Sequence, residues 1–307
     1  MAHITETPNS KQAINLKPQS LLVISGTLIG MNFPLGKVAL NAGVPPLLWA
    51  GLVSFGVLFI LLPVNLFQGR LKRPSRAVLK YTLLSAPISF VVPNLLIYSV
   101  MPHLGAGYVG LMFALSPVFT LCFATCLGMK TPGKLGLLGI GVGLLGAATI
   151  SISQTTSPNA PDLISLALAV GIPLALATGN ITRSLYWPEG EAPSFLALWG
   201  HTLASAIYFL ILMLLYQRIP LEFVEPVSHI AVIQMLISGI TFPFVYRLQK
   251  YGGPVLLSQM GYVAAAIGLV SATLFLGERY PTTTWLGAGI IATGIYLTVK
   301  AQTQSSR

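Results

Sequence analysis

The sequence predicts an all-α membrane protein in which ten transmembrane helices form two inverted five-helix repeats around a central cavity. Three observations predict this architecture. The 307 residues are 54% hydrophobic and only 8% charged, whereas soluble domains average about 25% charged residues. Apolar runs of about 20 residues, long enough to cross a bilayer, follow one another with short gaps. Residues of the same type also recur at a constant separation of 148 positions, close to half the chain.

Connectors rich in Pro, Gly and charge separate the apolar runs, because Pro and Gly end helices. The predicted spans are residues 20–41, 46–67, 77–100, 105–127, 134–153, 162–185, 194–216, 228–248, 254–276 and 283–300. The predicted domains are an N-terminal tail (1–19), a first five-helix repeat (20–153), a linker (154–161), a second five-helix repeat (162–300) and a C-terminal tail (301–307).

The distribution of Lys and Arg predicts the orientation, because cytoplasmic loops carry an excess of these residues. With ten spans and both termini in the cytoplasm, all but three of the 17 Lys and Arg residues fall on the cytoplasmic side. The three on the outer side are Lys37, Arg218 and Arg279. The net charge of +10 therefore belongs to one membrane face. Nucleic-acid binding is not predicted, because the aromatic and basic interleaving of nucleic-acid surfaces is absent.

The constant offset predicts that the halves are repeats. It aligns Asn32 with Asn180, Tyr98 with Tyr246, and Gly105 with Gly253. It also aligns three glycines of the fifth span with three of the tenth. Because each half holds five spans, an odd number, the second half must be inverted relative to the first. The Gly-rich fifth and tenth spans are predicted either to pack together or to form a homodimer face.

The first span carries polar residues where an ordinary span would carry Leu or Val. The stretch LIGMNFPLGKVAL contains Asn32, Pro34 and Lys37, and its counterpart ALATGNITRSLY contains Asn180 and Arg183. Corresponding interrupted helices in two halves predict a transporter's binding site. Asn32 either contacts substrate or bonds the carbonyl freed by Pro34, and Lys37 either faces the cavity or snorkels to the headgroups. Arg183 is predicted to be an interfacial anchor.

Three motifs resemble the EamA type of the drug/metabolite transporter superfamily: NFPLGKVAL, ALSPVFTL and GERYPTTTWLGAGIIATGIYL. The resemblance covers residues 20–300. Gly277 and Glu278 match the Gly-Glu pair that closes each half in this family, whereas the first half reads LGMKTPGKLG and lacks the acid. The resemblance implies a metabolite transporter of the bacterial inner membrane, working by alternating access and exporting an amino acid or similar solute. Glu278 is predicted to pair with Arg279 and to cap the last span.

Polar residues in spans that flank the central cavity in this family are the candidate substrate contacts. With the residues above, the predicted substrate-binding set is Asn32, Lys37, Asn94, Tyr98, Asn180, His201, Tyr246, Gln259 and Tyr262. A lone His such as His201 either bonds a neighbouring helix or relays protons, the first being favoured. The expected partners are a small-molecule substrate and the lipid bilayer.

The sequence lacks the residues that other classes of function require. No Asp or Glu lies in the interior of a predicted span, so proton exchange through a buried carboxylate is not predicted. No HExxH, His-acid pair or Gly-x-Ser-x-Gly is present, so neither a membrane-embedded enzyme nor a cofactor is predicted. The short tails argue against a sensor. Cys122 and Cys126 are predicted to be buried thiols, since two Cys without a nearby His or carboxylate make a poor metal site.

Overall fold

The computed structural model describes residues 16–129, 132–155 and 163–305, and every regular element in these ranges is a helix. The elements, in order, are α1 (Pro18–Asn41), α2 (Pro46–Phe67), α3 (Arg76–Ala86), the π-turn η1 (Pro87–Val91), α4 (Val92–Leu104), α5 (Ala106–Phe113), α6 (Ser116–Cys126), α7 (Lys134–Thr155), α8 (Leu163–Leu185), α9 (Pro193–Tyr216), the 3₁₀ turns η2 (Leu221–Phe223) and η3 (Glu225–Val227), α10 (Ser228–Ser258), α11 (Met260–Leu276) and α12 (Thr282–Ser305). The predicted all-α fold is confirmed.

Local sequence signals set the helix ends. Pro18, Pro46 and Pro193 begin α1, α2 and α9, where their missing N–H costs no hydrogen bond. Ser75 caps α3 by accepting a hydrogen bond from the Val78 N–H at 3.3 Å. Gly277 ends α11 with a φ of 65°, a left-handed conformation that glycine adopts without strain. The predicted boundaries consequently fall within a few residues of most observed ones.

The helices have the length and composition of membrane spans. Within the described residues, seven helical segments are long and apolar enough to cross a bilayer. Three of the seven combine consecutive elements: α3 through α4, α5 with α6, and η3 with α10. Two shorter apolar segments are α11 and the first part of α7, Lys134–Gly146. The chain is therefore a multi-pass membrane protein.

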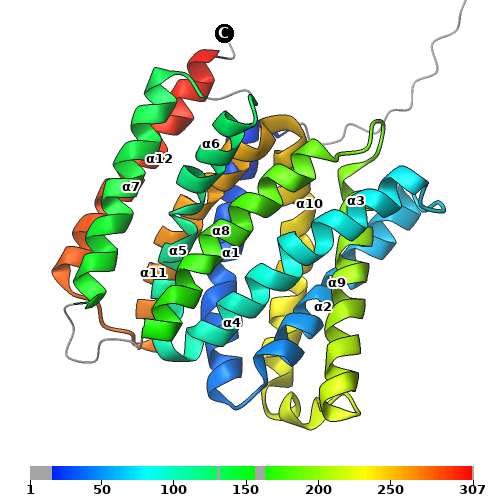
Figure 1. Ribbon diagram of the computed structural model, residues 1–307. Coiled ribbons are helices and arrows are strands. Elements are labelled where there is room, and N and C mark those ends of the chain that lie inside the picture. Colours follow the sequence, from blue (N-terminus) through cyan, green and yellow to red (C-terminus); the bar gives the residue numbers. More distant parts are fainter. Residues whose placement is uncertain (1–15, 130–131, 156–162, 306–307) are drawn as a thin grey trace, which may run out of the picture.

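Successive spans run in opposite directions, so the connectors between them alternate between the two ends of the bundle (Figure 1). We call the end at which α1 begins and α12 ends the terminal end, and the other the distal end. The α8–α9 connector lies at the terminal end, whereas the α4–α5 junction and the α9–α10 connector lie at the distal end. Contacts between sequence-distant helices hold the bundle together: α1 packs against α10 and α11, and α2 against α9 and α10.

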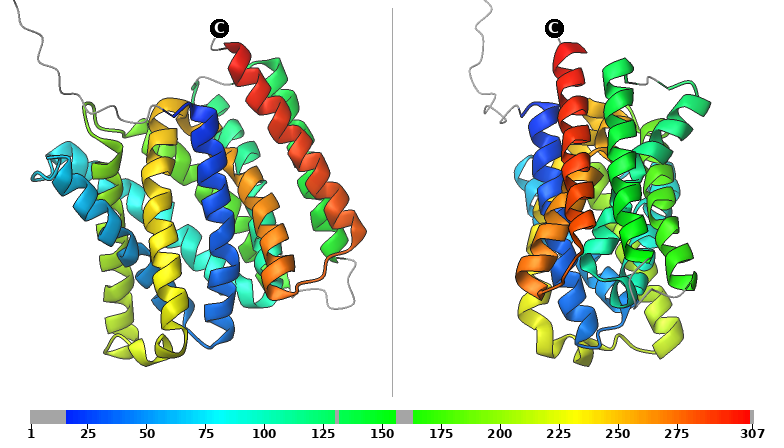
Figure 2. Two further views of the ribbon diagram at one scale, coloured as in Figure 1. Left: turned by 180° about the vertical axis from the view of Figure 1, so that it is seen from behind. Right: turned by 90° about the vertical axis from the view of Figure 1, so that its left-hand side faces the viewer.

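Glycines permit the closest helix contacts. A Cβ on Gly26 or Gly30 of α1 would meet Val263 or Ile267 and backbone carbonyls of α11. The Gly-rich α7 and α12 pack along each other at one edge of the bundle (Figures 1 and 2). Of the two predicted uses of these helices, packing together is observed. A homodimer through them stays a prediction.

The α7–α12 contact gives a matched test of packing. A Cβ on Gly139 would lie 2.8 Å from the Gly294 carbonyl oxygen and 2.9 Å from the Thr298 nitrogen, whereas a Cβ on Gly141 would meet nothing within 4 Å. Overpacking costs about 1–3 kcal/mol. Gly139→Ala is therefore expected to lower the thermal unfolding temperature in detergent, and Gly141→Ala to leave it unchanged or raise it. Equal temperatures for the two variants would contradict this contact.

Three interruptions of the helices position the site. The π-turn η1, which begins at Pro87, follows α3 directly and continues into α4. Such turns widen a helix locally and frequently occur at functional sites. Gly105, with φ 85° and ψ 157°, separates α4 from α5. Gly253, its partner at the 148-residue offset, breaks the end of α10 with φ 72° and ψ 179°. Both conformations suit glycine alone.

Candidate functional site: a central polar cavity

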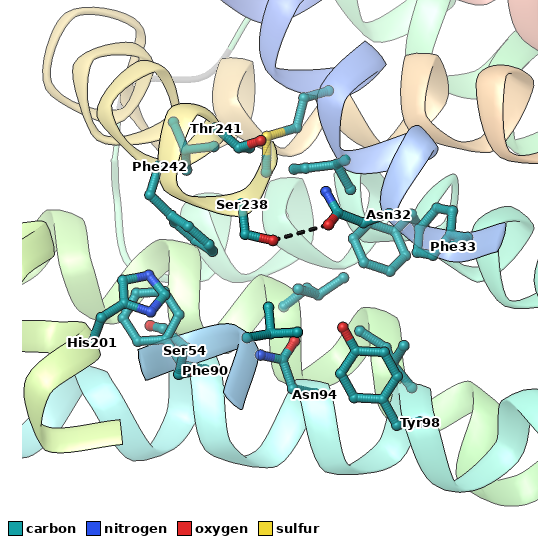
Figure 3. A pocket seen from close by; sticks show the side chains of 18 of the residues that line it. Asn32, Phe33, Ser54, Phe90, Asn94, Tyr98, His201, Ser238, Thr241 and Phe242 are labelled. Atoms are coloured by element: carbon teal, nitrogen blue, oxygen red, sulfur yellow. Dashed lines mark hydrogen bonds between the residues drawn. The ribbon is translucent and has the colours of Figure 1, made fainter. Parts of the chain in front are cut away.

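A cavity of about 110 Å³ lies at the centre of the bundle, enclosed by α1, α2, η1, α4, α5, α8, α9, α10 and α11 (Figure 3). Helices of both sequence halves contribute to it. Phe33, Phe90, Phe113 and Phe242 supply aromatic surface. The polar residues of the lining are Asn32, Ser54, Ser89, Asn94, Tyr98, Asn180, Arg183, His201, Ser238 and Thr241. The structure thus brings together five of the nine predicted site residues: Asn32, Asn94, Tyr98, Asn180 and His201.

Asn32 joins the first half to the second across the cavity. Its Oδ1 accepts a hydrogen bond from the Ser238 hydroxyl of α10 at 2.9 Å, drawn in Figure 3. Its Nδ2 donates to the Leu28 carbonyl at 2.8 Å. Pro34 deprives the Gly30 carbonyl, four residues earlier, of its helical donor. Asn32 therefore does not bond the freed carbonyl and presents its amide to the cavity.

Tyr98 is fixed by a chain of hydrogen bonds through α10. Gln234 donates from Nε2 to the Tyr98 hydroxyl at 2.9 Å and accepts at Oε1 from Trp49 Nε1 at 3.1 Å. The π-turn is held similarly, because the Tyr208 hydroxyl donates to the Phe90 carbonyl at 2.9 Å. Gln234 and Tyr208 do not line the cavity, but they fix residues that do.

His201 lies between two aromatic rings. Its ring centroid is 4.3 Å from that of Phe90 and 4.0 Å from that of Phe242. Figure 3 labels all three rings. The side chain is buried, and neither ring nitrogen has a hydrogen-bond partner in the described part of the chain. The favoured prediction of a bond to a neighbouring helix is therefore wrong. The Ser54 and Ser89 hydroxyls of the lining likewise lack partners there. Buried polar groups of this kind are costly unless another molecule satisfies them.

Arg183 is the principal difference from the sequence prediction. It is only 5% exposed and lines the cavity, so the interfacial anchor is wrong. Its Nη2 donates to Asn180 Oδ1 at 2.7 Å, and both Nε and Nη2 donate to Gln249 Oε1 at 3.3 Å. The guanidinium carbon lies 5.9 Å from the ring centroids of Phe90 and Tyr246. α10 folds over the end of α8 and thereby removes this side chain from the surface.

The other four predicted residues lie outside the lining. Lys37 donates from Nζ to the carbonyls of Met101 and Pro102 at 2.9 Å, in the last turn of α4. Tyr246 packs behind Phe90, with ring centroids 6.3 Å apart. Gln259 is buried at the α10–α11 junction, and Tyr262 donates to the Ile140 carbonyl of α7 at 3.2 Å. Substrate contact by Lys37, Tyr246, Gln259 and Tyr262 stays a prediction that the cavity lining does not support.

Glu278 lies at the distal end of the bundle, and its contacts differ from the predicted ones. Its Oε1 accepts from the Ala106 N–H at 3.0 Å and its Oε2 from the Gly107 N–H at 3.2 Å. The carboxylate therefore caps α5 in the other half instead of the last span. No ion pair with Arg279 forms among the described residues. Burial, and then the charge of Glu278, raise the pKa of the Tyr280 phenol, which stays protonated and donates to Glu278.

The described residues contain neither a candidate metal site nor a disulfide. No group of three His, Cys, Asp or Glu residues there could hold a metal ion. Cys122 and Cys126 are free and exposed, so the predicted burial of these thiols is wrong. They lie in the last two turns of α6, on a face that the other described helices leave uncovered.

Sequence reasoning missed several lining residues. Ser54, Ser89, Ser238 and Thr241 are small hydroxyl residues that occur commonly in membrane helices, and nothing local separates those that face a cavity. One signal was available for Ser89 and Phe90: they lie between Pro87 and Pro93, which indicate an irregular helix.

Comparison with known proteins places this cavity in context. The EamA-like transporter family model matches the chain twice, at residues 16–152 and 164–300. An Escherichia coli K12 protein named "Probable amino-acid metabolite efflux pump" is 26% identical over 294 residues, covering 91% of this chain and 93% of that protein. "Uncharacterized inner membrane transporter YedA" of the same strain is 23% identical, covering 91% of each chain. A crystal structure with a TM-score of 0.63 at 14% identity covers 90% of this chain and shares its fold.

Proposed function

Because the chain belongs to the EamA-like transporter family, we propose that it exports a small organic metabolite, such as an amino acid or a compound derived from one. The similarity to a protein named as an amino-acid metabolite efflux pump supports this class of solute and this direction. The similarity to a protein named as an inner membrane transporter supports the bacterial inner membrane as its location. The alternatives, a membrane-embedded enzyme and a sensor, have no comparable support.

We propose ten spans in two inverted halves, with both termini in the cytoplasm. Besides the seven long segments, α7, α11 and α12 would complete this number, with Gly253 dividing the eighth span from the ninth. The two matches of the family model support the division into halves. The equivalent glycines Gly105 and Gly253 support the inversion, because the junctions that they form lie at opposite ends of the bundle.

The observation that carries the proposal is the central cavity itself. It lies between the halves, it is lined by aromatic rings and polar groups, and several of these polar groups have no partner among the described residues. A site of this composition suits a small amphipathic solute. We assign Asn32, Asn94, Tyr98, Asn180 and His201 as its substrate contacts. Transport would proceed by alternating access, with the two halves rocking about this site.

Reconstitution in liposomes tests the proposal. Purified protein is expected to carry at least one radiolabelled amino acid across the bilayer above the rate of empty liposomes. Asn32→Leu keeps the shape of the side chain but removes both polar atoms, so transport should fall at least fivefold. Thr178→Val on the exposed face of α8 is the control and should transport normally. Absence of uptake for every amino acid, or equal rates for both variants, would contradict the proposal.

A further inference from the structure

Arg183 is a buried cation whose hydrogen-bond partners are all neutral. Asn180 and Gln249 accept from Nε and Nη2, and among the described residues no hydrogen bond involves Nη1. Arg183 forms no ion pair with a described residue, so no carboxylate there neutralises this guanidinium. A buried charge is costly unless an opposite charge accompanies it. The arrangement is therefore incomplete without an anion.

The residues that surround Arg183 indicate the chemistry of the anion. The Ser89 hydroxyl and both His201 nitrogens are buried without partners and belong to the same lining as Arg183. Aromatic rings cover much of the remaining wall. A single guanidinium matches a monoanionic carboxylate, whereas phosphate groups usually recruit more than one cation. The fitting ligand has one carboxylate, a further polar group and a compact apolar body.

Arg183 also lies in the wall between two spaces. A second pocket of about 390 Å³ opens beside the α8–α9 connector and is lined by Ser184, Trp187, Gln249 and Gly253, among others. Asn180 and Arg183 belong to the central cavity, whereas Gln249 belongs to the second pocket. Gln249 Nε2 donates to the Asn180 carbonyl at 3.0 Å and to the Ser184 hydroxyl. These bonds separate the cavity from the pocket at the terminal end.

The distal end is held by a different kind of contact. The Met101 carbonyl accepts a hydrogen bond from Lys37, and Met101 is the counterpart of Gln249 at the 148-residue offset. Lys37 and Arg183 therefore bind equivalent positions of the two halves. Lys37 is held by two backbone carbonyls, which are fixed in the last turn of α4. Arg183 is held by side-chain amides, which can rotate away. The terminal end therefore has a barrier that a ligand can open by competing with these amides for the cation.

We propose that Arg183 binds the carboxylate of the transported solute and that its bonds to Gln249 form the barrier toward the second pocket. This inference rests on the proposed transport function. A carboxylate that engages the guanidinium displaces the amide oxygens and frees Gln249, four residues before the break at Gly253. Solute binding thus favours the conformation in which the terminal end is open, because the ligand interacts better with that state.

Matched pairs of probes test the carboxylate subsite in purified full-length protein. Each amino acid and its carboxamide are compared for their effect on the thermal unfolding temperature, since a ligand of the folded state raises it. At least one amino acid is expected to raise the temperature of the wild type while its amide does not. Arg183→Gln should abolish the rise and Arg183→Lys should keep part of it. Arg218→Gln, which removes an exposed cation, should behave as the wild type.

Gln249→Glu is the sharpest variant. It places a permanent carboxylate beside Arg183, so the protein should unfold at or above the wild-type temperature. No amino acid should then raise its unfolding temperature further. Wild-type protection of this variant would overturn the subsite. Equal protection of the wild type by an amino acid and its amide would also overturn the subsite. The absence of protection by any acid or amide would overturn it as well. Unchanged transport by Arg183→Gln would overturn the subsite while leaving the transport function in place.

Cysteine labelling tests the barrier. In a Cys122→Ser, Cys126→Ser background, Ser89→Cys places one thiol in the central cavity. Adding Gln249→Ala should speed its reaction with a water-soluble maleimide at least fivefold, because the wall to the second pocket is gone. Adding Arg218→Gln should leave the rate unchanged. Equal rates with and without Gln249→Ala would overturn the assignment of this barrier.

Discussion

Replacing His201 with phenylalanine is expected to stabilise the protein and to impair transport. Both ring nitrogens of His201 are buried without partners in the described structure, and an unsatisfied buried polar group costs about 1–3 kcal/mol. Phenylalanine has a similar shape and would keep the ring contacts with Phe90 and Phe242. A solute that uses these nitrogens would lose its partner. The thermal unfolding temperature should rise, and the transport rate in liposomes should fall at least tenfold.

The opposite signs of these two effects separate a functional role from a structural one. Ser25→Ala provides the control, because the Ser25 hydroxyl is also buried without a partner among the described residues but lies outside the cavity lining. It should stabilise the protein slightly and leave transport unchanged. If His201→Phe lowered the unfolding temperature and transport together, the ring nitrogens would be part of the folding core and not of the binding site.

The sequence predicted the features that repeat or that depend on apolar length. Helix boundaries follow from Pro, Gly and hydrophobic runs, and those signals are local. The 148-residue offset identified Asn32 and Asn180, which lie on opposite helices of one cavity. It also paired Gly105 with Gly253, and both adopt positive φ. In these cases the fold places equivalent residues in equivalent environments, so a sequence comparison within the chain is sufficient.

Arg183 and Glu278 show where such reasoning stops. Each lies near a helix end beside polar residues, and in each case an interfacial role was the simplest expectation. Arg183 bonds Gln249 besides the nearby Asn180, and Glu278 bonds the N-terminus of α5. Gln249 and the start of α5 are each 66 or more residues away in the sequence. Only the path of α10 over α8, and of the 277–281 connector against α5, decides that these charges are directed inward. Neither path is encoded in the residues adjacent to the charge.

Truncating Glu278 is expected to cause the largest loss of stability among these variants. The carboxylate satisfies two backbone N–H groups at the start of α5 and receives the Tyr280 hydroxyl, and the charge of Lys37 attracts it. Hydrogen bonds to a charged group contribute about 1.5–3 kcal/mol each, and orphaned N–H groups add a desolvation cost. Glu278→Ala should therefore lower the free energy of unfolding by about 3 kcal/mol or more, with a marked fall in the thermal unfolding temperature.

The comparison with Glu222 shows whether this effect is specific. Glu222 also pairs with a cation, Arg218, but the pair is exposed and lies within one connector, where ion pairs contribute less than about 1 kcal/mol. Glu222→Ala should consequently be nearly neutral, and Glu278→Gln should fall between the wild type and Glu278→Ala, since an amide oxygen still accepts one N–H. Because Glu278 joins the second half of the chain to the first, its loss should also loosen the distal end of the cavity. Similar unfolding temperatures for Glu278→Ala and Glu222→Ala would show that the distal end is held by helix packing alone.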